Sequence, residues 1–190
     1  AELLVRGGER VAVLGLTTPT ASRKATTRIL EALVTSLASP AVQKSRPPKT
    51  TPSRQSSVLL FGDFLAPIAA IRERLDVLAA AGCTGHLVQI LDPAEETLPY
   101  EGRTEFLSPD GSQRWIADRA ESLRDRYRAR LLAHRAAIQE IAHRLGWSFL
   151  VHHTDRPASE PLLSLLMRLQ GSHGGYRWMG SSSDVTERTS

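Results

Sequence analysis

The sequence contains a single cysteine, Cys83, among its 190 residues. One cysteine excludes an internal disulfide and a zinc site built from cysteines. Because disulfides persist mainly in oxidising compartments, this scarcity favours the cytoplasm as the location of the protein. Cys83 lies between a helical pattern and an apolar strand pattern, where a small buried hydrophobic residue is typical. We therefore expect Cys83 to be buried and to take no part in catalysis.

Long apolar runs and dense basic runs are also missing. No stretch of about 18 apolar residues is present, so the sequence has no candidate membrane span. Residues 1–6 lack the small-residue cleavage site of a secretory signal peptide. The net charge is +4, but the 24 basic residues are interspersed with 20 acidic ones, and only 5% of residues are aromatic. RNA-binding platforms combine clustered basic and aromatic residues, so we predict no nucleic-acid partner.

Motifs of the common enzyme classes are missing as well. There is no Gly-x-Ser-x-Gly nucleophile elbow. The glycine pairs at residues 7–8 and 174–175 lack the spacing of a P-loop or of a dinucleotide-binding loop. The sequence therefore favours a protein without enzymatic activity.

The residues that are present alternate between apolar runs and amphipathic stretches. Short apolar runs predict buried strands at 11–16, 58–61, 86–91 and 147–152. Apolar residues at helical spacing predict helices over 22–37, from Pro67 to Gly82, and over 118–145 and 160–169. This alternation predicts an α/β fold with a mostly parallel sheet and right-handed crossovers.

Three segments depart from this alternation. Residues 104–107 and 113–116 flank the turn sequence Ser-Pro-Asp-Gly, which predicts a small β-hairpin. Residues 39–57 hold four prolines and little apolar bulk, which predicts a flexible loop. Residues 171–190 are rich in glycine and serine and predict a disordered tail. The predicted domain therefore occupies residues 1–170.

An ordered series of motifs resembles the bacterial family called domain of unknown function 58, from about residue 5 to residue 169. The series, in chain order, is a strand followed by Gly62-Asp63-Phe64-Leu65, the string Asp-Pro-Ala-Glu-Glu-Thr-Leu-Pro at 92–99 with Gly102, the Asp110-Gly111 hairpin, an arginine-rich helix containing residues 127–131, and then Gly146, a strand and Thr154-Asp155. The order and spacing of the whole set, rather than any one motif, carry the resemblance.

The resemblance implies a three-layer, Rossmann-like fold of the von Willebrand factor A type. Many such domains hold a divalent cation with an Asp-x-Ser-x-Ser motif after the first strand, a threonine and a further aspartate. Asp63 matches the further aspartate by position, but the sequence contains no Asp-x-Ser-x-Ser. The resemblance places the first, central strand before residue 1. We therefore expect an N-terminally incomplete domain in which 1–6 ends a helix, and Mg²⁺ binding only if upstream residues supply the motif.

The absent central strand has a consequence for the sheet. In the A-type fold that strand lies beside both 11–16 and 58–61. We therefore expect 58–61 to pair with 86–91 on one side and to be anomalous on its other side, where backbone groups would lack partners.

The resemblance also implies a partner. Members of this family are often encoded beside MoxR-type AAA+ ATPases. This implies a scaffold or adaptor role in which the domain docks such an ATPase or its client.

Carboxylates that follow the predicted strands are the candidate site. Asp63 follows the second predicted strand, Asp92, Glu95 and Glu96 follow the third, and Asp155 follows the last. The carboxyl ends of parallel strands meet at one edge of the sheet, where α/β proteins place functional groups. Two interpretations stay open. The carboxylates form a functional edge, for an interaction or for a metal-dependent hydrolase or nucleotide-binding enzyme, or they cap helices and brace turns.

Histidines offer weaker candidates. His152 and His153 stand beside Asp155, but no third ligand has a recognisable spacing, so strand-end packing is favoured over a metal site. His134 falls on the apolar stripe of the long helix, which predicts a packed histidine. His143 is predicted to lie on the solvated face.

Overall fold

The structure, a computed structural model, describes residues 1–37, 50, 52–108 and 111–173. Its centre is a parallel sheet of three strands in the order β1-β2-β5. These strands are β1 (Ser57–Gly62), β2 (Thr84–Leu91) and β5 (Ser148–His153). β3 (Thr104–Leu107) and β4 (Arg114–Ala117) form a separate antiparallel pair. The predicted α/β class, with a parallel sheet and a small hairpin excursion, is confirmed.

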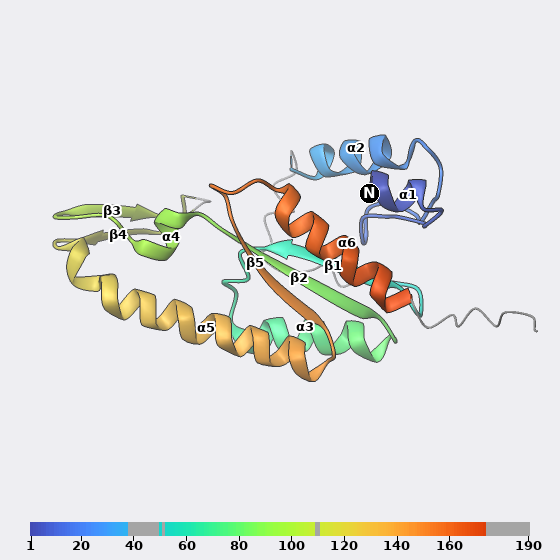
Figure 1. Ribbon diagram of the computed structural model, residues 1–190. Helices are drawn as coiled ribbons and strands as arrows, with labels where there is room; N and C mark the ends of the chain where they lie inside the picture. Colours follow the sequence, from blue (N-terminus) through green and yellow to red (C-terminus); the bar gives the residue numbers. More distant parts are fainter. Residues whose placement is uncertain (38–49, 51, 109–110, 174–190) are drawn as a thin grey trace, which may run out of the picture.

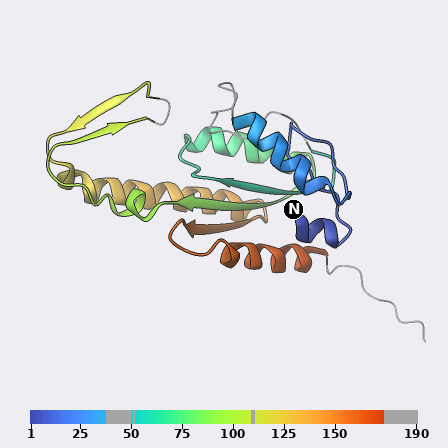
Figure 2. The ribbon, with the colours of Figure 1, turned by 90° about the horizontal axis from the view of Figure 1, so that it is seen from above.

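Helices lie on both sides of the parallel sheet (Figures 1 and 2). α3 (Ile68–Ala80) and α5 (Arg124–Arg144) cover one side, and α6 (Ser159–His173) lies on the other. The core lies between the sheet and the first pair of helices. Its best buried members are Leu75, Leu78, Leu87, Ile138 and Ile141. Cys83 is also buried there, as predicted.

Short helices complete the described chain. α1 (Glu2–Arg6) lies within the segment expected to end a helix, and α2 (Ala25–Leu37) occupies most of the predicted 22–37 helix. α4 (Pro93–Thr97) follows β2, and a single 3₁₀ turn, η2 (Ala120–Leu123), leads into α5. The long helix therefore begins as an α-helix at Arg124, six residues later than predicted from the sequence.

The prediction of a strand at 11–16 is wrong. This segment folds back on itself through one isolated antiparallel bridge between Val11 and Thr20, with backbone hydrogen bonds of 3.0 and 3.1 Å. The hydroxyl of Thr17 accepts a hydrogen bond from the backbone N–H of Val13 at 2.8 Å. Gly15 adopts a φ of 77°, which favours glycine. Local turn bonds thus use the backbone groups that a strand would offer to the sheet.

β1 lies at the edge of the sheet, as expected. Its residues pair in register with β2, from Ser57 opposite Thr84 to Gly62 opposite Gln89. Within the described residues, the other side of β1 has no strand partner and no backbone hydrogen bond to another segment. Phe61 is exposed on this edge.

The predicted loop and tail differ from the structure at their ends. Most of the loop predicted at 39–57 lies outside the described residues, but its last residue, Ser57, begins β1. The sequence predicts a tail from residue 171, yet α6 continues to His173. The rest of the predicted tail, 174–190, lies outside the described residues.

The apolar stripe of α2 is largely exposed, at Leu30, Leu33 and Val34.

Candidate functional site at the carboxyl edge of the sheet

The carboxyl ends of β1, β2 and β5 lie along one edge of the sheet, which we call the carboxyl edge. Asp63 follows β1 and is exposed. Its carboxylate accepts a hydrogen bond from the backbone N–H of Leu65 at 3.1 Å, which makes a local turn. Its carbonyl oxygen accepts a second bond, at 2.8 Å, from the side-chain amide of Gln89. Asp63 therefore braces the loop between β1 and α3.

Asp92 and Glu95 cap α4. Asp92 accepts a hydrogen bond from the backbone N–H of Ala94 at 2.8 Å, and the Glu95 carboxylate accepts one from the backbone N–H of Asp92 at 3.3 Å. This reciprocal arrangement is a capping box, with Pro93 at the first turn of the helix. The second oxygen of Asp92 accepts the Thr154 hydroxyl at 2.9 Å, which ties β2 to the turn after β5.

These residues do not fit a divalent cation site. Both oxygens of Asp92 accept hydrogen bonds from within the chain, and Asp155 is exposed in a turn after β5. Mg²⁺ requires several oxygen ligands at octahedral positions. In the described part of the chain, no three His, Cys, Asp or Glu side chains converge in a way that could hold a metal ion. The carboxyl edge thus gathers the predicted carboxylates without joining them into one site.

A second polar cluster lies beneath this edge, on the side of the sheet that faces α5. We call it the Glu96 network, and it comprises Gln89, Glu96, Arg135 and His153. Glu96 receives Arg135 at 2.8 Å on one carboxylate oxygen and Nε2 of His153 at 2.6 Å on the other. Nε of Arg135 also donates to the fully buried Gln89 side chain at 3.2 Å. The network therefore joins β2, β5, α4 and α5.

Burial and charge set the protonation of this network. Burial alone raises the pKa of Glu96, but hydrogen bonds from His153 and Arg135, and their charges, outweigh burial and leave the pKa of Glu96 lowered. The nearby Tyr127 behaves in the opposite way. Burial, and then the negative charges of Glu95 and Glu96, raise the pKa of its phenol. Glu96 is therefore ionised and Tyr127 is neutral at neutral pH.

The chemistry open to the network is limited by its own contacts. The side chains of Arg135 and Glu96 are only 16% and 23% exposed, and each is engaged with another member. A general base needs a free oxygen or nitrogen within reach of a substrate proton. Both carboxylate oxygens of Glu96 are already engaged. The geometry suits a tie between the sheet and two helices.

Sequence reasoning found the carboxyl edge but missed half of the Glu96 network. Gln89 is a polar residue within the apolar run of β2, and a buried polar group needs a partner, so the sequence did contain a signal for it. Arg135 gave no signal, because it is one of many arginines in α5. The sequence predicts strand-end packing for His153, and its side chain contacts Glu96 from the end of β5.

His134 and His143 lie in the environments predicted for them. Nε2 of His134 lies 2.8 Å from the carbonyl oxygen of Phe64, so this half-buried histidine connects α5 to the loop after β1. His143 is exposed, as predicted.

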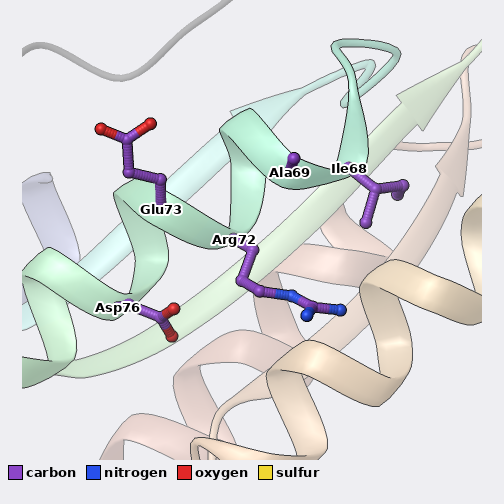
Figure 3. Close-up of a pocket in the computed structure, with 5 residues that line it drawn as sticks. All are labelled: Ile68, Ala69, Arg72, Glu73 and Asp76. Atoms are coloured by element: carbon purple, nitrogen blue, oxygen red, sulfur yellow. The ribbon is translucent and has the colours of Figure 1, made fainter.

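A shallow depression on α3 is separate from both clusters. Its lining residues are Ile68, Ala69, Arg72, Glu73 and Asp76 (Figure 3). All five belong to one helix, so no second element closes over the depression. None of the carboxylates predicted from the sequence lines it.

Comparisons with known proteins give a family and little else. The family model described as "Protein of unknown function DUF58" matches residues 1–137. No curated protein matches the chain. An uncharacterized membrane spanning protein from Vibrio fischeri has a similar solved structure, at 14% identity and a TM-score of 0.28. The alignment covers 86% of this chain and 61% of that one, so this chain spans less than two thirds of its length. A likeness this weak carries no argument about this protein. Among the described residues, no helix is long and apolar enough to cross a bilayer.

Proposed function

The chain belongs to the DUF58 family of proteins of unknown function, and we propose that it is a non-enzymatic protein-interaction domain of the von Willebrand factor A type. One contrast carries the proposal. Polar side chains at the carboxyl edge are engaged with one another, whereas large apolar side chains are exposed elsewhere. An active site usually shows the reverse arrangement, with unengaged polar groups inside an apolar pocket.

The exposed apolar residues occur on several elements. They include Phe61 on β1, Leu107, Trp115 and Ile116 on the hairpin, and Leu162, Leu163 and Met167 on α6. Scattered exposed apolar residues are normal, but groups of them on one element are typical of interaction surfaces. Removing such surface from water gains about 25 cal/mol per Å². A protein partner would supply that gain.

The partner we propose is a MoxR-type AAA+ ATPase, for which this domain acts as a scaffold or adaptor. This part of the proposal rests on the family resemblance. The parallel order of β1, β2 and β5, with helices on both sides, is compatible with the A-type fold that the resemblance implies.

A reconstitution with a MoxR-type AAA+ ATPase tests the proposal. The chain and the ATPase would be purified separately, and their association measured by sedimentation velocity with and without ATP. We expect a complex, and a change in the ATP hydrolysis rate of the ATPase at saturating chain. The Met167→Ser and Trp115→Ser variants would show which exposed apolar element the ATPase covers.

The contrary outcome is equally concrete. The chain alone would be titrated with Mg²⁺ and with ATP in a calorimeter, and then assayed for release of phosphate. Saturable binding followed by turnover, lost in the Asp92→Asn variant, would show a metal-dependent enzyme and overturn the proposal.

A further inference from the structure

His86 lies on the side of the parallel sheet that faces α6. Successive side chains of β2 point to opposite faces of the sheet. Leu87 joins the core on the side of α3 and α5, and Gln89 meets Arg135 of α5 on that same side. The side chain of His86 therefore points the other way, towards the side where α6 lies (Figure 1). His86 is only 5% exposed there, so a titratable group is buried between the sheet and a helix.

The hydrogen bonding of this buried imidazole is incomplete. Its Nδ1 lies 2.8 Å from the hydroxyl oxygen of Ser148 on β5. Its Nε2 is buried as well, and among the described residues it has no hydrogen-bond partner. A protonated imidazole carries an N–H on both nitrogens, and each N–H needs an acceptor. Protonation of His86 in this position would therefore place a charged donor without a partner in the interior, which is costly.

The groups that surround His86 supply no negative charge. In the register of the sheet its neighbours are Leu59 on β1 and Ser148 on β5, and both are uncharged. From α6, the guanidinium of Arg168 is the only charge in the described part of the chain that shifts the pKa of His86. Burial, and then this positive charge, hold that pKa below its ordinary value. Both effects last only while α6 stays on the sheet.

Of the elements around His86, α6 is the one outside the sheet. β1, β2 and β5 hold one another through continuous parallel ladders. Among its described side chains, α6 buries only Leu165 and Leu169, whereas Met167 is 72% exposed. Elements with few buried apolar contacts open locally at a lower free energy than the core does. The element that can yield without loss of the sheet is therefore α6.

We propose that α6 is a cover that acid releases, in which protonation of His86 detaches α6 from the sheet while β1, β2, β5, α3 and α5 keep their packing. Detachment lets water reach Nε2 and takes Arg168 away from the imidazole, so one movement relieves both costs of protonation. It also uncovers Leu165 and Leu169. The inference goes beyond the proposed interaction function and does not depend on an ATPase partner.

Hydrogen exchange measured by mass spectrometry tests the release, because peptides from α6 and from α5 are followed separately. The full chain would be studied from about pH 8 to about pH 5, with rates corrected for the pH dependence of exchange in an unfolded chain. Below about pH 6.5, the protection of α6 should fall about tenfold for each pH unit until the lowered pKa is reached. The protection of α5 should change by less than about twofold over the same range.

Variants separate the imidazole from general effects of acid. His86→Gln keeps a polar side chain that does not titrate, so the protection of α6 should become independent of pH. Arg168 is exposed, so its replacement leaves the core intact. Arg168→Gln should make the fall in protection smaller, and Arg168→Lys should restore it. His143→Gln is the matched control, because His143 is exposed on α5 and the profile of α6 should equal that of the wild type.

A titration of the His86 ring by nuclear magnetic resonance gives a second readout. The pKa of His86 should lie below about 6.5 in the wild type and rise in Arg168→Gln. A pKa at or above that value in the wild type would overturn the proposal. So would loss of protection in α6 and α5 together, which would show global unfolding, or unchanged protection of α6 down to about pH 5. A fall in protection that persists in His86→Gln would assign the release to another group and would equally refute the role of His86.

Discussion

The indole ring of Trp147 lies directly against the backbone of Gly85, in the space that a β-carbon would occupy at that position. Trp147 enters β5 from the turn after α5, and Gly85 is the second residue of β2. Trp147 also belongs to the buried core. The contact fixes where β5 docks on the central strand.

We therefore predict that Gly85→Ala destabilises the protein. The added methyl group must displace the ring of Trp147, and overpacking of this kind costs about 1–3 kcal/mol. Gly62→Ala is the matched control, because a β-carbon at Gly62 would meet only the backbone nitrogen of Phe64, at 4.0 Å. Urea denaturation of both variants measures the difference. Equal stabilities for the two would show that the ring moves aside without cost.

Cys83 reports on opening of the core. It is the only cysteine in the chain, and burial raises the pKa of its thiol. Since the thiolate is the reactive form, we predict that the native protein reacts slowly with a thiol reagent at neutral pH. The unfolded protein should react at the rate of a free cysteine. Labelling in increasing urea should follow the unfolding curve measured by circular dichroism, and fast labelling without urea would contradict the buried position.

The Glu96 carboxylate, which pairs with Arg135, should stabilise the fold more than the exposed carboxylate of Glu95 does. Glu96→Gln removes the charge that faces a mostly buried arginine, and we expect a loss of about 2 kcal/mol after allowance for partial exposure. Glu95→Gln should cost less than about 0.5 kcal/mol, because an exposed amide still accepts the capping bond. A double-mutant cycle with Arg135→Met measures the coupling. Additive losses would refute an energetic link between the two side chains.

His86 gives the protein a defined sensitivity to acid. His86 is buried on β2, with Nδ1 2.8 Å from the Ser148 hydroxyl. Burial, and then the charge of Arg168, lower the pKa of His86. Below the ordinary histidine pKa of about 6.5, His86 is protonated in the unfolded chain but stays neutral in the folded chain. Stability from this residue is therefore fully present above that value and is lost as pH falls through the lowered pKa.

Melting temperatures between about pH 8 and about pH 5 test this prediction. The wild type should lose stability on the acid side, and His86→Gln should show a flatter profile over the same interval. A variant with the same slope as the wild type would assign the acid sensitivity to other groups.

The sequence predicts those parts of the fold that depend on residues close together in the chain. β1 and β2 are continuous apolar runs bounded by glycine, aspartate or serine, so their positions can be predicted to within two residues. The run at 11–16 is also apolar but closes on itself, because the Thr17 hydroxyl supplies a turn bond and Gly15 adopts a positive φ. Whether an apolar run finds a neighbouring strand is a property of the whole chain, and it cannot be read within a window of six residues.

The candidate site shows the same division. The capping box at Asp92 and Glu95 uses residues three positions apart, and helix caps leave a recognisable local pattern. The contact from Arg135 to Gln89 joins residues 46 positions apart. Only the packing of α5 against the sheet brings these two residues together. The sequence of α5 contains several arginines and does not show which of them contacts Gln89.

The crossover from β2 to β5 also bears on how fast the sheet forms. β5 pairs with β2 only after the chain between Leu91 and Ser148, which includes the β3–β4 hairpin, has looped out. Loop-closure entropy grows slowly with length, and a doubling adds about 0.6 kcal/mol. The hairpin therefore slows assembly of the parallel sheet very little. Lengthening or trimming the hairpin at the turn after Leu107 should leave the refolding rate of the sheet nearly unchanged.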